Sequence, residues 1–160
     1  MMAADIGLGL SVVAAGLWSG LLLTLTTILH PMFAQRDGDG FLADMRRFLP
    51  IARRSPTNYV LVLALIGAPI LALIGLGDMP GSAPFVLTAV GLGATVAGPL
   101  LTSALLAEPN YAVILGWRPG ALPPNWRAVR TRYYLLNWIR AVLTWTALAA
   151  FLTAAYLHLT

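Results

Sequence analysis

Long apolar stretches alternate with shorter polar stretches along this chain. Between Ile6 and Gln35 there is no Asp, Glu, Lys or Arg, and about 20 apolar residues are enough to cross the hydrocarbon core of a bilayer. Three more stretches of this kind follow. The four expected membrane helices cover residues of about 6–31, 56–76, 83–107 and 133–159. The pattern therefore predicts an all-α protein, a four-transmembrane-helix bundle that forms one domain over residues 1–160.

Two polar stretches, residues 32–55 and 108–132, are expected to be the loops at one end of this bundle. The sequence Ser55-Pro56 marks the start of the second span, because Ser is a good N-cap and Pro is tolerated at the first helical position. Within the first loop, the segment from Phe41 to Ile51 mixes large apolar residues with arginines. That mixture indicates a short helix lying at the membrane surface.

Composition supports the membrane interpretation. The chain is 59% hydrophobic and 10% charged, whereas soluble domains carry about 25% charged residues. Its net charge is +4, every basic side chain is Arg, and the arginines gather in the two polar stretches. The positive-inside rule places these loops in the cytoplasm and both termini outside. Because membrane lipids account for the basic charge, we exclude nucleic acid as a partner.

One polar stripe runs into the fourth apolar stretch. Read as a helix, the chain places Trp126, Arg130, Tyr133, Asn137 and Arg140 at steps of three and four residues, on one face. Polar and charged side chains inside a membrane must face protein, water or a ligand. The stripe is therefore expected to form one wall of a site.

The predicted topology brings four further polar residues to the same end. They are His30 at the end of the first helix, Asn58 at the start of the second, and Glu108 and Asn110 after the third. The opposite half of the bundle is almost entirely apolar. This asymmetry predicts a pocket that opens to the cytoplasm or the inner leaflet and has an apolar floor.

Two roles are open for several of these residues. His30 is the only candidate at this end for proton transfer at neutral pH, but it could equally be a structural hydrogen-bonding group. Arg140 could hold a substrate or pair with Glu108 and join the third and fourth helices. Tyr134 and Trp138 are interpreted as an interfacial aromatic belt.

The residues at this end make a poor metal-ligand set, so no metal site is predicted. The chain has no cysteine, which excludes disulfides and cysteine-based sites. We expect no bound cofactor, although a haem held by His30 or a bound quinone is left open. Gly16 and Gly20 form a small-xxx-small face through which the chain could form a homo-oligomer.

Four short motifs follow one another along the chain. They are His30-Pro31, Pro109-Asn110, the Trp-x3-Arg-x-Arg-aromatic sequence from Trp126 to Tyr133, and Asn137 with Arg140. In this order they resemble the anthrone oxygenase-like family of small four-helix membrane proteins, many of which are known only as a domain of unknown function. The resemblance covers most of the chain. Asn137 and Tyr133 stand where that family frequently has His and Trp.

The resemblance implies oxidation of a lipophilic aromatic substrate, anthrone- or quinol-like, by molecular oxygen without a bound metal or flavin. His30 would be the base that forms a carbanion, and Arg140, Asn137 and Tyr133 would stabilise the enolate oxygen. Trp126, Arg130, Asn110, Glu108 and Asn58 are the expected substrate-binding residues. Two alternatives stand beside this hypothesis: a non-catalytic binding or transport module for a hydrophobic anion, and a structural subunit of a membrane complex.

Overall fold

The computed structural model describes residues 2–160, and over that range the protein is built from helices and contains no β-strand. The helices are α1 (Met2–Thr24), α2 (His30–Ala34), α3 (Gly38–Arg54), α4 (Pro56–Gly75), α5 (Ala83–Thr95), α6 (Glu108–Leu115) and α7 (Trp126–Leu159). Two π-helical segments, η1 (Leu25–Leu29) and η2 (Val96–Ala107), join α1 to α2 and α5 to α6 without a break.

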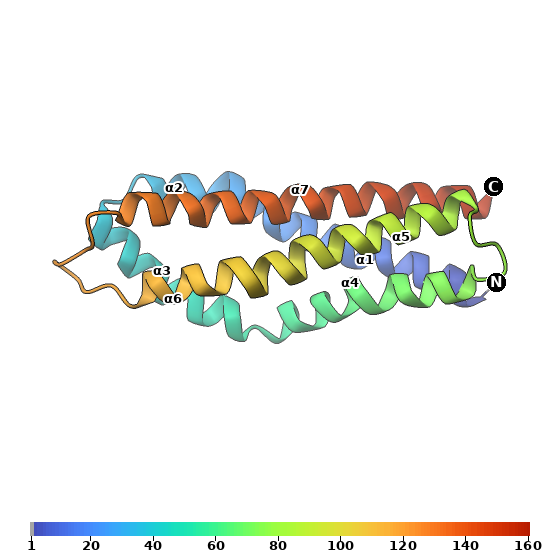
Figure 1. The fold of residues 1–160 in the computed structure, drawn as a ribbon, viewed down its shortest axis with the longest axis horizontal. Helices are drawn as coiled ribbons and strands as arrows, with labels where there is room; N and C mark the ends of the chain where they lie inside the picture. Colours follow the sequence, from blue (N-terminus) through green and yellow to red (C-terminus); the bar gives the residue numbers. More distant parts are fainter. Residues whose placement is uncertain (1) are drawn as a thin grey trace.

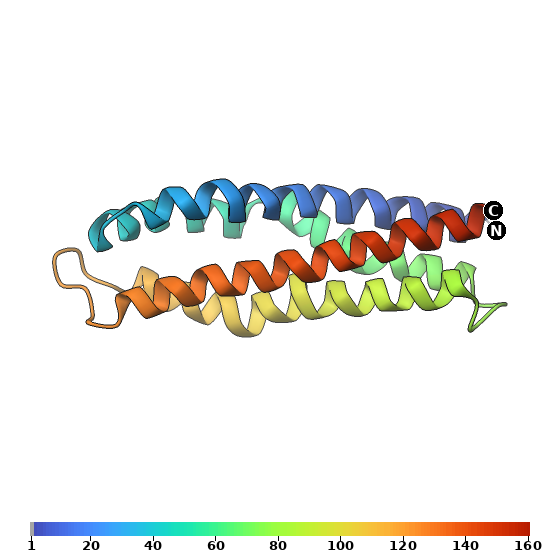
Figure 2. The same cartoon turned by 90° about the horizontal axis from the view of Figure 1, so that it is seen from above.

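Four of the resulting helices are long and apolar enough to cross a membrane: Met2–Ala34, Pro56–Gly75, Ala83–Leu115 and Trp126–Leu159. This finding confirms the all-helical prediction and supports an integral membrane protein. The helices run side by side in one elongated bundle, with both termini at the same end (Figures 1 and 2). At 1.5 Å per residue, a helix of 33 residues is roughly 50 Å long, well beyond the ~30 Å hydrocarbon core.

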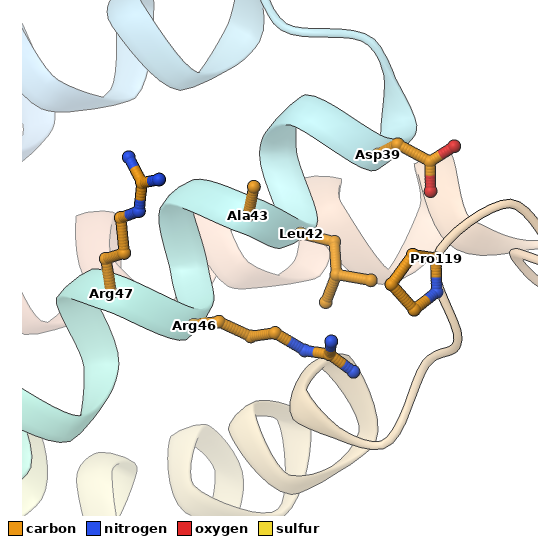
Figure 3. Close-up of a pocket in the computed structure, with 6 residues that line it drawn as sticks. All are labelled: Asp39, Leu42, Ala43, Arg46, Arg47 and Pro119. Carbon is orange, nitrogen blue, oxygen red and sulfur yellow. The ribbon is translucent and has the colours of Figure 1, made fainter.

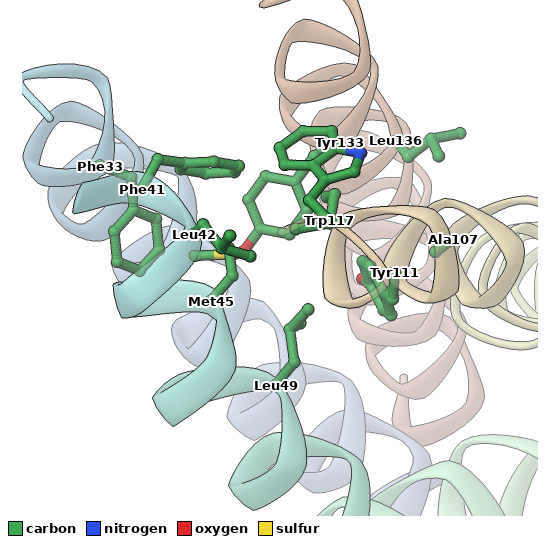
Figure 4. Packing of buried hydrophobic residues seen from close by; sticks show 11 residues of the cluster. Phe33, Phe41, Leu42, Met45, Leu49, Ala107, Tyr111, Trp117, Tyr133 and Leu136 are labelled. Atoms are coloured by element: carbon green, nitrogen blue, oxygen red, sulfur yellow. The ribbon is translucent and has the colours of Figure 1, made fainter. Parts of the chain in front are cut away.

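The excess length forms a helical headpiece at the end remote from the termini, where the sequence predicted two loops. We define the headpiece as α2, α3, α6, the 116–125 loop and the first turns of α7. The surface helix expected from Phe41 to Ile51 is present, but it is longer, and its apolar face packs on protein (Figure 4). The core of the headpiece is rich in aromatic residues: Phe33, Phe41, Leu42, Met45, Leu49, Ala107, Tyr111, Ile114, Trp117, Tyr133 and Leu136.

Proline did not end the first and third long helices where the sequence predicted. The first helix continues past Pro31 and the third past Pro109. A proline ring clashes with the carbonyl four residues earlier in an α-helix, and the wider turns of η1 and η2 precede these two prolines. Hydroxyl side chains donate hydrogen bonds to backbone carbonyls in these segments. For example, Thr102 Oγ1 donates to the Ala97 carbonyl at 2.7 Å.

Glycines allow the closest helix contacts in the apolar half of the bundle. A Cβ on Gly7 would collide with the backbone of Ala72, and a Cβ on Gly91 would collide with the ring of Phe151. These contacts bring α1 against α4 and α5 against α7. At the end that carries the termini, His158 Nε2 lies 2.9 Å from a carboxylate oxygen of Asp5 and joins the two ends of the chain.

Candidate functional site

A cavity of about 630 Å³ lies where the membrane half of the bundle meets the headpiece. Its walls come from α1 and η1, from the corner between α3 and α4, from η2 and α6, and from α7. In Figure 1 the α3–α4 corner lies at the edge of the bundle, away from α7. The lining is mainly apolar, and its charged and amide side chains are Arg53, Asn58, Glu108 and Arg140. Both π-helical segments contribute to the wall, which agrees with the frequent occurrence of such segments at functional sites.

Arg140 is the central polar group of this cavity. Its Nη1 donates to the side-chain oxygen of Asn137 at 2.9 Å and to the hydroxyl of Tyr111 at 3.3 Å. The guanidinium carbon lies 5.9 Å from the centre of the Trp18 ring, and Nε is buried without a partner in the described residues. No carboxylate of residues 2–160 pairs with Arg140. The cavity therefore contains a positive charge that only neutral groups surround directly.

The predicted pair between Arg140 and Glu108 is absent, and that alternative is wrong. Glu108 instead pairs with Arg53, with Nη2 and Oε2 2.6 Å apart. The sequence interpretation missed this pair because the surface helix was expected to end at Ile51, whereas the last turn of α3 places Arg53 opposite the start of α6. The two side chains are 44% and 38% exposed, so the pair lies at the surface end of the cavity.

His30 does not line the cavity. It is buried, and its ring packs against Tyr133 at 5.4 Å and Tyr134 at 4.6 Å between ring centres. Tyr133 lines the cavity and is almost completely buried. Neither ring nitrogen of His30 nor the Tyr133 hydroxyl has a hydrogen-bond partner within the described chain. The structure thus places Tyr133 against both the predicted base and the cavity.

Tyr134 was interpreted as part of an aromatic belt, and the structure corrects that interpretation. Its ring packs on His30, and its hydroxyl is buried without a partner in the described residues. Trp138, in contrast, is 40% exposed and packs edge-on against Trp145. The two residues are four positions apart and lie on the same side of α7, so the difference comes from their neighbours: the His30 ring covers Tyr134, whereas Trp138 packs on Trp145 further along the same helix.

Asn137 acts on the site through Arg140. Its side-chain nitrogen donates to the Tyr133 carbonyl at 3.0 Å, which leaves the side-chain oxygen to accept from Arg140. Asn137 is 1% exposed and does not line the cavity. It therefore holds the guanidinium in place.

Trp126, Arg130 and Asn110 lie outside the cavity, although the sequence placed them in the binding site. The Arg130 guanidinium lies 4.8 Å from the Trp126 ring centre and donates to the Arg36 carbonyl at 3.0 Å. The amide of Asn110 donates to the Val129 carbonyl at 3.5 Å. These contacts fasten α7 to the rest of the headpiece.

Asn58 does line the cavity, but its amide nitrogen is engaged by the Ala52 carbonyl at 2.8 Å. The Tyr59 hydroxyl similarly donates to the Arg53 carbonyl at 2.8 Å. Both bonds satisfy carbonyls at the end of α3. They stabilise the corner that forms one side of the cavity.

Sequence reasoning missed several polar or aromatic residues of this cavity, among them Trp18, Arg53 and Tyr111. Tyr111 had a usable signal, since it follows Glu108 by three residues and would share its helix face if the third helix continued. Trp18 had none, because it stands in an otherwise apolar span. Arg53 required knowledge that α3 extends beyond Ile51 and packs on the bundle.

A second hollow, of about 300 Å³, lies between α3 and the 116–125 loop (Figure 3). Arg46 Nη2 donates to the Trp117 carbonyl at 2.6 Å, and the Asp39 carboxylate accepts from the Gly120 backbone nitrogen at 2.9 Å. Two of the three charged side chains that line it, Asp39 and Arg46, are thus engaged by the loop. We assign this hollow a structural role in holding the loop on α3.

The chemistry available at the main cavity is anion binding within an apolar space. No group of three or more His, Cys, Asp or Glu side chains comes together from Met2 onward. An arginine that lacks a carboxylate partner in such a space can bind a carboxylate, a phenolate or an enolate oxygen. No family model, curated protein or solved structure matches this chain.

Proposed function

We propose that the protein binds a lipophilic aromatic molecule with an ionisable oxygen in the main cavity and oxidises it with molecular oxygen. The observation that carries this proposal is the guanidinium of Arg140, which faces an apolar cavity of about 630 Å³ without a carboxylate partner in the described residues. A cavity of this size suits one small-molecule ligand. Fixed charge in a dry site stabilises an oxyanion strongly.

In the proposed reaction, a base removes a benzylic proton and the resulting carbanion is stabilised as an enolate on Arg140. The carbanion reduces oxygen and, after reprotonation, becomes a hydroperoxide. Loss of water from the hydroperoxide leaves a ketone, so one oxygen molecule is consumed and one water is released per substrate. Asn137 and Tyr111, which contact Arg140, keep the guanidinium aimed at the enolate oxygen. This scheme agrees with the resemblance to the anthrone oxygenase-like family.

His30 is the proposed base, and Tyr133 stands between it and the cavity. In this scheme Tyr133 lies on the path of the proton from the substrate to His30. The position of His30 behind Tyr133 also favours a second candidate function, in which the cavity binds a hydrophobic anion without turnover. A purely structural bundle would leave the open cavity beside Arg140 without a role.

We also propose that the headpiece lies in the cytoplasm and that both termini lie outside. Its support is the distribution of arginine, because the headpiece and its loops carry nearly all the arginines while the turn between α4 and α5 carries none. Cytoplasmic loops are enriched in Lys and Arg.

The test is oxygen uptake by the purified chain in vesicles supplied with an anthrone. We expect equal amounts of oxygen consumed and anthraquinone formed. Arg140→Gln should lower turnover or binding by about 10- to 100-fold, because it removes a buried charged hydrogen-bond donor. Arg132→Gln, an exposed arginine on the same helix, is the matched control and should leave both unchanged.

Three outcomes separate the possibilities. Full activity in His30→Ala would show that His30 is not the base. Saturable binding with no oxygen uptake would establish the binding function instead of the oxidation. Unchanged binding and unchanged turnover in Arg140→Gln, with unchanged thermal stability, would reject the site.

A further inference from the structure

The main cavity has three zones along the axis of the bundle. Aromatic residues of the headpiece form the upper zone, with Phe48, Tyr111 and Tyr133. Charged side chains form a middle zone, where Arg53, Glu108 and Arg140 lie. The lower zone, nearest the termini, is formed by side chains that include Trp18, Val62 and Leu100. A ligand that satisfied all three zones would have an aromatic head, an anionic oxygen and an aliphatic tail.

The depth of the middle zone matches the boundary of the hydrocarbon core. The span Pro56–Gly75 has 20 residues and is just long enough to cross that core. Arg53 therefore lies immediately beyond the boundary. The α7 segment from Arg140 to Leu159 also measures roughly 30 Å at 1.5 Å per residue, so Arg140 reaches the same level. The lower zone is then at the depth of lipid chains.

The cavity is open on its side, at the middle and lower zones, and closed at the upper one. Among the residues that line it, Ile51 near the end of α3 is 74% exposed and Tyr59 at the start of α4 is 61% exposed, while Leu21 and Leu100 in the membrane half are 46% and 39% exposed. Tyr111 and Tyr133 in the upper zone are 8% and 1% exposed. A ligand can therefore reach Arg140 sideways, from the level of the α3–α4 corner to the level of the lipid chains, whereas the buried Tyr111 and Tyr133 block a path from above.

We propose that the ligand is a bilayer-resident amphiphile, an aromatic ring with an acidic oxygen and an aliphatic chain, which enters sideways from the leaflet next to the headpiece. Its ring occupies the upper zone, its oxygen meets Arg140, and its chain stays in the lower zone and reaches into the lipid. The three charged groups of the middle zone sum to one positive charge, which complements one acidic oxygen. This inference rests on the binding part of the proposed function and does not require the oxidation.

The test uses the protein in phosphatidylcholine vesicles and an alkylated 2-hydroxy-1,4-naphthoquinone as the probe. This probe is an anion at neutral pH and quenches tryptophan fluorescence, and Trp18 lines the cavity. We expect saturable quenching of the five tryptophans, part of which Trp18→Phe removes. The 2-methoxy analogue, which lacks the charge, and the hydroxynaphthoquinone without the alkyl chain should each bind at least about tenfold more weakly.

Two pairs of bulky substitutions on η2 test the route. Ala104→Trp and Leu100→Trp narrow the opening and should weaken binding at least about tenfold. Ala97→Trp and Leu101→Trp are matched controls, because both residues are exposed on the same element but do not line the cavity. Melting temperatures in detergent confirm that each variant is folded.

Equal affinity for the probe with and without its alkyl chain would overturn the inference. So would a probe affinity equal to that of the wild type in both Ala104→Trp and Leu100→Trp. These failures are distinct from failure of the proposed function. A water-soluble anthrone that is oxidised normally by Ala104→Trp would leave the oxidation standing and reject the lateral route. Saturable, charge-dependent and chain-dependent binding without oxygen uptake would uphold the route and reject the oxidation.

Discussion

At the scale of single residues, the distinguishing feature of the site is that two arginines, Arg53 and Arg140, share the cavity with one carboxylate. Glu108 is the one carboxylate that lines the main cavity, and Arg53 engages it. Arg140 is left with Asn137, Tyr111 and the face of Trp18. Even a partly buried arginine is costly to the fold unless something compensates its charge. Its retention beside an open cavity is the strongest residue-level argument for an anionic ligand.

The pair of Arg53 and Glu108 gives a prediction that separates stability from binding. Both side chains are more than a third exposed, and exposed ion pairs contribute about 0–1 kcal/mol to stability. Glu108→Gln should therefore change the free energy of unfolding by less than about 1 kcal/mol. It also raises the net charge of the middle zone by one and frees Arg53. The acidic naphthoquinone probe should then bind severalfold more tightly in a direct titration.

Asp44→Asn is the control for this prediction. Asp44 pairs with Arg36 at 3.0 Å in the headpiece, outside the main cavity. Removal of that carboxylate changes the net charge of the protein by the same amount but leaves the cavity unaltered. Equal effects of the two variants on probe binding would show that overall charge, not the freed Arg53, is responsible.

At the scale of helices, the apolar half of the bundle depends on close contact at a few glycines. Gly91 on α5 faces the ring of Phe151, whereas a Cβ on Gly93 meets nothing within 4 Å. Gly91→Val should destabilise the protein by about 1–3 kcal/mol, because an overpacked core must shift backbone or side chains. Gly93→Val carries the same loss of glycine flexibility without the collision. The comparison is made by thermal unfolding in detergent.

A similar loss of stability in both variants would assign the effect to helix propensity instead of packing.

Gly16 and Gly20, the expected oligomer face, do not pack closely against the other helices of the chain. A Cβ at either position meets nothing within 4 Å in the single chain. The face is therefore free for a neighbour, and homo-oligomer formation stays a prediction.

The spans were predictable from sequence because an apolar run of about 20 residues has few alternatives. The inward stripe on α7 was predictable because residues at steps of three and four share one helix face. Tyr133 and Asn137, which are spaced in this way, are both buried. The headpiece was not. Its helix α3 carries arginines on one face, which is also the pattern of a membrane-surface helix, and only the fold shows that Phe41 and Met45 pack on protein.

Side-chain partners were the least predictable part of the site. Topology placed Glu108 and Arg140 at the same end, but the choice between Arg53 and Arg140 as partner depends on a few ångströms of helix position. The separation of His30 from the cavity was equally hidden, because it depends on which side of Tyr133 the histidine ring packs. Sequence spacing indicates a shared face, and it carries no information about the order of side chains across a core.

At the scale of the whole molecule, the bundle is longer than a membrane is thick, and this mismatch decides where the site lies. If the apolar spans occupy the hydrocarbon core, the headpiece stands in the interface and the water beyond it. The main cavity then lies at the boundary, where a lipid-soluble ligand and dissolved oxygen or water meet. This position of the site requires the headpiece to lie outside the hydrocarbon core. Otherwise the arginines of α3 would be buried in lipid at a high energetic cost.

This placement predicts the outcome of single-cysteine labelling. The chain has no cysteine, so Met79→Cys, in the exposed turn between α4 and α5, and Arg118→Cys, in the exposed 116–125 loop, each create one reporter thiol. A membrane-impermeant maleimide added to intact cells should label Met79→Cys and spare Arg118→Cys. Inverted vesicles should reverse the result, because arginine-rich segments stay in the cytoplasm. Labelling of Arg118→Cys alone from outside would invert the proposed orientation. Labelling of both from outside would contradict a membrane-spanning bundle, and with it the depth that places Arg140 at the boundary.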